Sequence, residues 1–204
     1  MGKEVAFMNK LDELRKHLKH GTVYRREDLA KWSNAVDRHI KQLVASEELV
    51  KLSPGLYLHP KKTVFGKAPA DDTSLVSAFL KDKRFLITSP NAYNALGVGA
   101  TQLYNETVVY NHKRHGHFKL GGRMFEFRRK PSFPKKMTEE FLLVDLMNNL
   151  EQVAEDEQFL VSRVKEKSER LNSKSLKRAA HEFGSVRTRR FFDNVMMKVQ
   201  NHAG

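Results

Sequence analysis

The pattern of apolar and polar positions is clearest between residues 33 and 60, where it predicts a helix followed by two short strands. Four apolar positions have the spacing of one helix face: Val36, Ile40, Leu43 and Val44. At 3.6 residues per turn, the opposite face carries polar or small side chains, which are Asn34, Arg38, Lys41 and Ala45. A helix that packs through its apolar face would therefore present an amide and two cations to its surroundings.

Two short apolar runs follow this helix and predict a hairpin. The runs are Leu49–Leu52 and Leu56–His59, and Ser53-Pro54-Gly55 separates them. Proline at the second and glycine at the third turn position suit a tight reversal, because proline fixes its own φ and glycine accepts positive φ. Ser33 is expected to cap the helix, since its hydroxyl can accept a backbone N–H at the N-terminus.

The residues ahead of this helix supply the other parts of a winged helix-turn-helix. A first helix is expected over Met8–Leu18 and a short extended piece over Thr22–Tyr24. A second helix is expected to begin near Arg26 and to run through Ala30, because Glu27 and Asp28 favour a helix N-terminus. Helix, strand, helix, turn, helix and wing in this order are typical of proteins that place the third helix in a DNA major groove.

The remainder of the chain predicts a second, mixed region. Residues 60–70 contain two prolines and a glycine and are interpreted as a linker. A basic α/β part is expected over residues 71–130 and a helical part over residues 138–200. Expected strands are Phe85–Thr88, Glu106–Asn111 and Arg123–Arg129, and expected helices are Thr73–Leu80, Phe141–Leu150, Glu157–Leu171, Lys174–Phe183 and Val186–Val199. The predicted fold class is α+β, with a winged helix-turn-helix domain over 1–60 and a second domain over 61–204.

The charge of the chain indicates a polyanionic partner. Its formal net charge is +13, which suits DNA, RNA or an anionic membrane surface. Residues 61–136 carry 15 Lys and Arg against 5 Asp and Glu, whereas residues 1–60 carry 11 against 8. The middle segment is thus expected to approach phosphate groups as well, and a solvated basic surface without a role is the alternative.

Other features exclude several classes of protein. The absence of cysteine excludes disulfides, thiolate catalysis and cysteine-based zinc sites. Met1–Lys10 has no apolar run of the kind found in signal peptides, and no segment has the length needed to span a bilayer. The sequence therefore predicts a cytoplasmic protein, and no membrane is expected among its partners.

Two clusters suggest chemistry, and both have simpler explanations. His112, His115 and His117 could hold a metal ion, but Lys113 and Arg114 between them favour a basic hairpin tip. Glu126-Phe127-Arg128 is similar to the acid-x-lysine pattern of metal-dependent nucleases, with Asp71 or Asp72 as a second ligand. Arginine stays charged at neutral pH and cannot transfer the proton, which favours an exposed acid paired with a neighbouring arginine. No catalytic residue, metal or cofactor is predicted, and the chain is not expected to be an enzyme.

One C-terminal helix is expected to be strongly amphipathic. Leu176, Ala179, Ala180 and Phe183 would face inward, and Lys174, Lys177, Arg178 and His181 outward. The outward face could be a second DNA surface, a surface for a partner protein or a solvated face.

Several segments together resemble a known family. GTVYRREDLA, AVDRHIKQLVASEELVKLSPGLYLHP, KAPADD, a helix ending in NALGV and a basic hairpin occur in this order over residues 21–130. They resemble the AbiEi-type antitoxins of bacterial type IV toxin–antitoxin systems. The resemblance implies a repressor that binds inverted repeats of double-stranded DNA in its own operator, with a functional link to a nucleotidyltransferase-like toxin.

The resemblance also implies which residues bind DNA. Ser33, Asn34, Arg38 and Lys41 would read the operator, and Arg25 and Arg26 would face the DNA backbone. Arg25 stands where a Thr or Ser cap is commoner in the family. On the wing, whose tip is uncharged, Lys51 is the expected phosphate contact. The alternatives are a winged-helix nuclease, an orphan regulator without a toxin and a protein-interaction adaptor.

Overall fold

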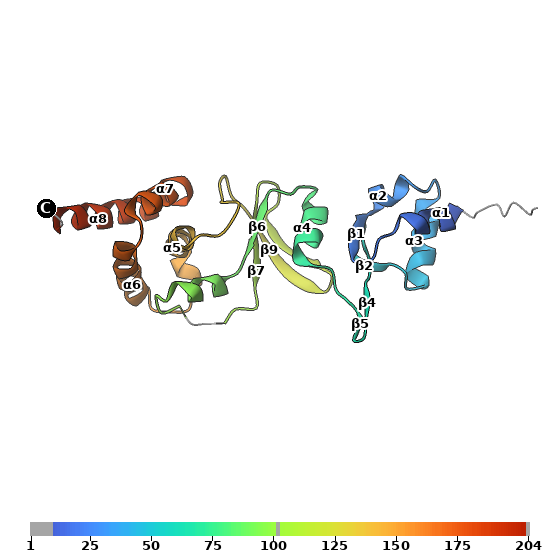
Figure 1. The fold of residues 1–204 in the computed structure, drawn as a ribbon, viewed down its shortest axis with the longest axis horizontal. Coiled ribbons are helices and arrows are strands. Elements are labelled where there is room, and N and C mark those ends of the chain that lie inside the picture. Colours follow the sequence, from blue (N-terminus) through green and yellow to red (C-terminus); the bar gives the residue numbers. More distant parts are fainter. Residues whose placement is uncertain (1–9, 101–102, 203–204) are drawn as a thin grey trace, which may run out of the picture. The chain divides into compact units, whose positions relative to one another are not determined.

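The computed structural model of the protein describes residues 10–100 and 103–202 and has an α+β fold (Figure 1). The N-terminal elements are α1 (Lys10–His17), β1 (Thr22–Arg25), α2 (Arg26–Ala30), α3 (Val36–Ala45), β2 (Val50–Ser53), β3 (Leu56–His59), β4 (Lys62–Thr63), β5 (Gly66–Lys67) and α4 (Asp72–Leu80). The central elements are β6 (Phe85–Thr88), the 3-10 helix η1 (Pro90–Leu96), β7 (Thr107–Asn111), β8 (Gly116–Leu120) and β9 (Arg123–Arg129). The C-terminal elements are α5 (Glu139–Asn148), the 3-10 helix η2 (Leu150–Gln152), α6 (Glu157–Arg170), α7 (Ser173–Phe183) and α8 (Val186–His202).

The strands pair in sheets of order β1-β3-β2, β4-β5 and β6-β7-β9-β8. The chain divides into two compact units, each with its own core. The first unit comprises Met1–Lys83 and His117–Phe125, and the second comprises Arg84–Gly116 and Glu126–Gly204.

The first unit contains a winged helix-turn-helix. Strand β3 lies between β1 and β2 and is antiparallel to both, with Thr22 opposite His59 and Val50 opposite Leu58. Its core residues come from all three helices and the sheet: Leu11, Leu14, Tyr24, Leu29, Val36, Ile40, Leu43 and Leu49. The predicted apolar stripe of α3 is confirmed, because Val36, Ile40 and Leu43 are buried and Val44 is half-buried. Met8, where the first helix was expected to begin, lies outside the described residues.

The start of the third helix differs from the sequence prediction. Helix α3 begins at Val36 with Ala35 as its N-cap, so Ser33 is not the cap and Asn34 lies in the preceding turn. The hydroxyl of Ser33 instead lies 2.7 Å from Nδ1 of His39 and accepts the backbone N–H of Ala35 at 3.2 Å. The prediction of a cap was wrong because the Ser33 hydroxyl is hydrogen-bonded to the buried imidazole of His39, which lies in the first turn of α3.

The interpretation of residues 60–70 as a linker was incomplete. This stretch contains the β4–β5 hairpin, in which Lys62 pairs with Lys67 and Thr63 with Gly66. Glycine at position 66 has φ of 105°, a conformation that favours glycine and closes the turn. The prolines and the glycine indicated a break in regular structure, but they did not indicate the two short strands between them.

Two further local predictions need correction. Strand β8 lies between the two strands expected at 106–111 and 123–129, where a basic hairpin tip was expected to occupy His112–His117. Its apolar residues Phe118 and Leu120 alternate with cationic ones, so the basic composition obscured a strand of period two. The helix expected to end in NALGV is a 3-10 helix over residues 90–96, and Gly97 follows it with a left-handed backbone.

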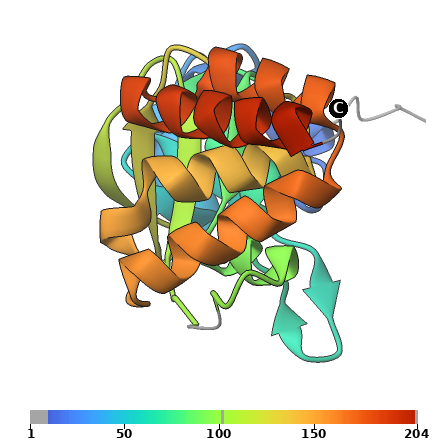
Figure 2. The same ribbon diagram turned by 90° about the vertical axis from the view of Figure 1, so that its left-hand side faces the viewer.

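The second unit is built around α5. Most of this helix is buried, including Phe141, Leu143, Val144, Asp145, Leu146 and Met147. Helices α7 and α8 pack against each other and against α5, and Figure 2 shows these helices face on. The four predicted C-terminal helices are confirmed, and so is the inward face of α7, on which Leu176, Ala179 and Ala180 are buried.

Candidate nucleic-acid interface

The outer face of α3 carries two unengaged cations. Arg38 and Lys41 are exposed on the side of the helix opposite Val36, Ile40 and Leu43. Within residues 10–100 and 103–202, neither side chain makes a hydrogen bond or an ion pair. Asn34 is also exposed, in the turn before the helix. An arginine or an asparagine without another partner can make two hydrogen bonds to the edge of one base.

Ser33 points away from this face. Its side chain belongs to a residue that is only 6% exposed, and its hydroxyl is bonded to the buried His39. Sequence reasoning missed His39 as a core residue. Its position three residues after Val36 and four before Leu43 places it on the buried face, which is the signal that could have found it. Ser33 therefore orients the turn from within, and it is not available to read a base.

Arg26 is engaged by an acid of the same unit. Its Nε and one terminal nitrogen donate to the two carboxylate oxygens of Asp37 at 2.7 and 2.6 Å. This ion pair joins the start of α2 to the first turn of α3. The hydrogen bond from Arg26 lowers the pKa of Asp37. Both side chains remain largely exposed.

Arg25 has a mainly structural position at the N-terminus of α2. Its Nε and a terminal nitrogen donate to Asp28 at 2.9 and 3.0 Å, and its backbone N–H donates to the same carboxylate at 3.1 Å. A third nitrogen lies 2.9 Å from Glu27. Asp28, at the third position of α2, thus accepts the backbone N–H of the N-cap residue Arg25. This hydrogen bond explains how an arginine can occupy a position where Thr or Ser would be expected.

The wing turn lies beside the same end of α2. The backbone N–H of Arg26 donates to the carbonyl of Gly55 at 2.9 Å, and Gly55 has φ of 75°. Lys51, on β2 of the wing, is exposed, and its side chain has no hydrogen-bond or ion-pair partner in the part of the chain that the structure describes. Of the predicted DNA contacts, Arg38, Lys41, Lys51 and Asn34 therefore have side chains without a hydrogen-bond or ion-pair partner among the described residues, whereas Arg25 and Arg26 are paired with acids.

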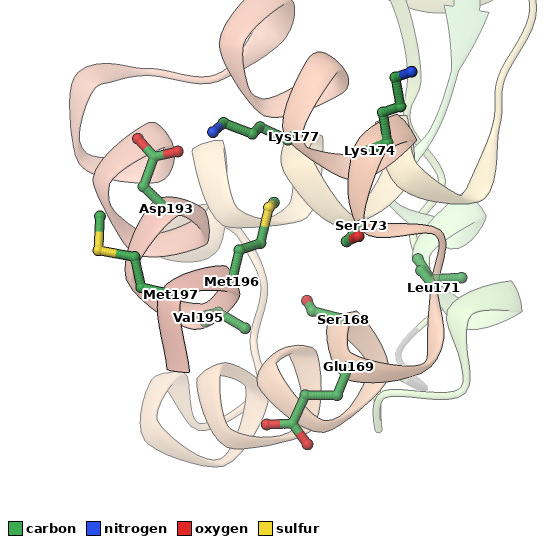
Figure 3. A pocket seen from close by; sticks show the side chains of 10 residues that line it. All are labelled: Ser168, Glu169, Leu171, Ser173, Lys174, Lys177, Asp193, Val195, Met196 and Met197. Carbon is green, nitrogen blue, oxygen red and sulfur yellow. The ribbon is translucent and has the colours of Figure 1, made fainter. Parts of the chain in front are cut away.

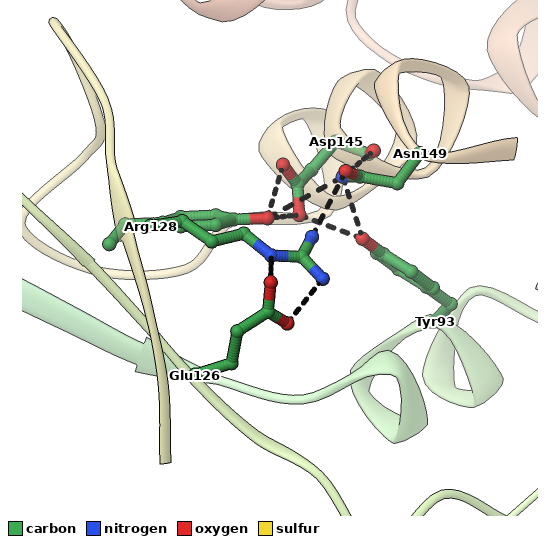
Figure 4. Close-up of polar contacts among 6 residues, drawn as sticks. Tyr93, Glu126, Arg128, Asp145 and Asn149 are labelled. Atoms are coloured by element: carbon green, nitrogen blue, oxygen red, sulfur yellow. Dashed lines mark hydrogen bonds and ion pairs between the residues drawn. The ribbon is translucent and has the colours of Figure 1, made fainter. Parts of the chain in front are cut away.

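The second unit contains a buried polar cluster around Asp145 (Figure 4). The Tyr93 hydroxyl donates to this carboxylate at 2.8 Å, and the Tyr110 hydroxyl donates to both of its oxygens at 3.0 and 2.9 Å. The Asn149 amide nitrogen lies 3.2 Å from the Tyr93 oxygen. Burial raises the pKa of Asp145 and also that of both tyrosines. The polar groups satisfy one another, which is the pattern of a network that fixes a core.

The carboxylates considered for a nuclease site are engaged separately. Arg128 donates to both oxygens of Glu126, at 2.7 and 2.6 Å, and both side chains are half-buried (Figure 4). Asp71 caps α4 by accepting the N–H of Ser74 at 3.0 Å, and Asp72 forms an ion pair with Arg123. The expected pairing of Glu126 with a neighbouring arginine is confirmed, but the acid is half-buried and not exposed as expected. No group of three or more His, Asp or Glu among the described residues could hold a metal ion.

A cavity of about 380 Å³ lies between α6, α7 and α8 in the second unit (Figure 3). Its apolar lining is Leu171, Val195, Met196 and Met197, and charges of both signs surround it, among them Lys174, Lys177, Glu169 and Asp193. The buried Ser168 hydroxyl donates to the Val164 carbonyl at 2.6 Å and is not available to a ligand. The residues that line this cavity therefore indicate no particular class of ligand.

The first unit thus defines a winged helix-turn-helix protein with unengaged cations on the outer face of its third helix. Over residues 10–180, the chain matches a family of unknown function, DUF6088, and it belongs to that family. Neither a curated protein nor a solved structure matches it. None of the helices in the described ranges is long and apolar enough to cross a bilayer.

Proposed function

We propose that this protein is a sequence-specific, double-stranded DNA-binding protein that represses transcription. The observation that carries the proposal is the pair of cations Arg38 and Lys41 on the exposed face of α3, whose side chains make no hydrogen bond or ion pair within residues 10–100 and 103–202. Winged helix-turn-helix proteins place this face in the major groove, where an arginine pairs with the O6 and N7 atoms of guanine.

The side chains around α3 divide into two roles. Arg38, Lys41 and Asn34 contact base edges, because they lie on or next to the free face of the helix. Lys51 contacts a phosphate from the wing. Arg26 contacts a second phosphate, which replaces one of its two contacts with the Asp37 carboxylate. This replacement costs little, because both side chains are exposed and an exposed ion pair is weak. Arg25 supports α2 and stays with Asp28.

The biological role follows from the resemblance to AbiEi-type antitoxins. The protein binds inverted repeats upstream of its own operon, represses it in the cytoplasm, and opposes a nucleotidyltransferase-like toxin. The support for this part is the order of segments over residues 21–130 together with a second, helix-rich unit that has a core of its own.

DNA binding is tested with the Arg38→Ala variant. A duplex selected by the wild-type protein from a random library serves as the probe, in shift assays and in a second round of selection. We expect binding to weaken by about 1–3 kcal/mol and base preference to relax at one position of each half-site. Arg170→Ala removes the same charge from an exposed site on α6 in the second unit and should leave base preference unchanged. Unchanged affinity and selectivity in Arg38→Ala would contradict the assignment of α3.

The antitoxin role is tested by co-expression with the gene that flanks this one. Wild-type protein should restore growth that the flanking gene product arrests. Arg38→Ala should lose repression of an operator–reporter fusion while it still restores growth, because neutralisation is assigned to the second unit. Repression without any rescue of growth would leave an orphan regulator.

A further inference from the structure

The β4–β5 hairpin presents an apolar tip to solvent. Val64 and Phe65 at the tip are 93% and 98% exposed, so these two adjacent side chains contact almost nothing of the protein. Exposing an aromatic ring to water is unfavourable, and a soluble protein normally buries it or uses it to bind a partner. The hairpin extends from the end of β3 in the first unit (Figure 1).

This hairpin has a defined shape. The Thr63 hydroxyl donates to the Gly66 carbonyl at 2.8 Å and accepts the N–H of Phe65 at 3.3 Å. The N–H of Ala68 donates to the carbonyl of Lys61 at 2.9 Å and closes the base. The tip side chains are therefore held outward by the turn itself.

The sides of the hairpin are cationic. Residues 61–67 include Lys61, Lys62 and Lys67 and no acid. Lys67 forms an ion pair of 2.7 Å with Glu47, and this pair ties the hairpin to the C-terminal end of α3. The side chains of Lys61 and Lys62 are exposed and have no hydrogen-bond or ion-pair partner among the residues that the structure covers.

The wing turn and the β4–β5 hairpin lie at opposite ends of strand β3. The wing turn is held at the start of α2 by the bond between Arg26 and Gly55, and the hairpin is held at the end of α3 by Lys67. Strand β3 connects the two, running from Leu56 beside the wing turn to His59 near the hairpin. A major groove is bordered on each side by a minor groove, so a protein with α3 in the major groove could use one ribbon on each side.

We propose that the β4–β5 hairpin is a second DNA-binding arm that enters a minor groove. Phe65, supported by Val64, inserts between two base pairs, and Lys61 and Lys62 contact the phosphates beside that step. Apolar wedges of this kind, on ribbons with cationic sides, kink the duplex and increase the surface that the protein contacts. This inference deepens the proposed function and rests on it.

Charge and area favour DNA over a second copy of the chain as the partner. An aromatic side chain buries roughly 150–250 Å² at most, so a two-residue tip provides far less than the ~1,200 Å² of a stable protein interface. The chain itself carries a net charge of +13, and a second copy would repel the lysines that flank the tip. A base step needs only one inserted side chain and attracts those lysines.

The test uses the full chain and a 40-bp duplex selected by it, with 2-aminopurine placed in turn at the adenines that flank the two half-sites. Insertion unstacks a base and raises 2-aminopurine fluorescence. We expect a rise at one flanking step with wild-type protein and its loss with Phe65→Ser, together with about tenfold weaker binding and unchanged base preference in the half-sites. Leu103→Ser removes an 85% exposed apolar side chain from the second unit and should keep the rise in fluorescence.

The possible outcomes separate the arm from the proposed function. Wild-type protein that binds its duplex, depends on Arg38 and raises no fluorescence at any flanking step would overturn the arm and leave DNA recognition by α3 in place. A wild-type dimer that becomes a monomer in Phe65→Ser, without a change in fluorescence, would instead assign the tip to a second copy. If the wild-type protein selected no duplex at low salt, the arm and the proposed function would both be wrong.

Discussion

At the scale of single residues, the charge available to a partner depends on which cations already have an acid. Arg25 and Arg26 are paired with Asp28 and Asp37, whereas Arg38, Lys41 and Lys51 are free within the described chain. The sequence alone does not show which of these five cations have an acidic partner. In the proposed complex with DNA, a phosphate would have to compete with Asp37 for Arg26.

The Asp37→Asn variant tests this competition. Asparagine keeps the size of the side chain and removes the charge that holds Arg26 and repels phosphate. We expect tighter DNA binding and a dependence on salt that is steeper by about one ion, since Arg26 then displaces a counterion of its own. Binding measured at several salt concentrations gives the slope.

Glu13→Gln is the matched control, because it removes an exposed acid of α1 in the same unit that pairs only with Lys10 among the described residues. A variant at position 37 that bound no better than this control would show that Arg26 takes no part in binding.

At the scale of elements, the short helix α2 depends on the contacts at its N-terminus. It has only five residues, and a helix of this length has little stability of its own. The carboxylate of Asp28 accepts the backbone N–H of Arg25 and pairs with its guanidinium, while the Arg26 N–H bonds to the wing. The same few bonds therefore position α2, the wing turn and the start of α3.

This arrangement predicts how the first unit responds to acid. The hydrogen bond from Arg25 lowers the pKa of Asp28 below its ordinary value of about 3.9. A carboxyl with a lowered folded-state pKa stabilises the fold above the unfolded-state value, and that contribution is lost as the pH falls through the lower folded-state value. Trp32, the one tryptophan of the sequence, packs against the core of the first unit, so its fluorescence reports the unfolding of that unit.

We therefore expect the urea midpoint from Trp32 fluorescence to fall as the pH drops below about 4, and to fall less in Asp28→Asn. Asparagine can still accept a hydrogen bond but cannot form the ion pair, so this variant should also be less stable at pH 7. An equally steep acid response in both proteins would count against the assignment to Asp28.

At the scale of the whole molecule, the two units carry ionisable groups with opposite preferences. In the first unit, Asp28 and Asp37 beside the proposed DNA-binding surface are half-buried and exposed, respectively, and both are paired with arginine. Asp145 of the second unit is buried, and its partners Tyr93 and Tyr110 are neutral donors. Burial raises the pKa of Asp145, so its protonated form is favoured in the folded state relative to the unfolded one.

The stability of the second unit should consequently decrease as the pH rises above about 4, the unfolded-state pKa of an aspartate, until it passes the folded-state pKa of Asp145. Asp145→Asn removes this charge, keeps an oxygen that accepts from a tyrosine, and should weaken the dependence on pH. Hydrogen exchange of α5, corrected for the intrinsic effect of pH, measures it while Trp32 fluorescence follows the first unit separately. A pH response of α5 that is identical in the variant would contradict the role of Asp145.

Local patterns in the sequence determined a large part of this fold. The stripe of Val36, Ile40 and Leu43 determines α3 and its outer face, and Pro54 with Gly55 determines the wing turn, because periodicity and turn geometry act over a few residues. The inward face of α7 follows in the same way from Leu176, Ala179 and Ala180.

Only the tertiary structure decided which polar groups find one another. The bond of Ser33 to His39, the pairs of Arg26 with Asp37 and of Glu126 with Arg128, and the cluster around Asp145 join residues whose chemistry is visible in the sequence but whose partners are not. Packing likewise decided that the tip of the β4–β5 hairpin stays uncovered. Burial and pairing depend on contacts between distant segments, and they determine which of the chain's many charges remain free to bind a partner.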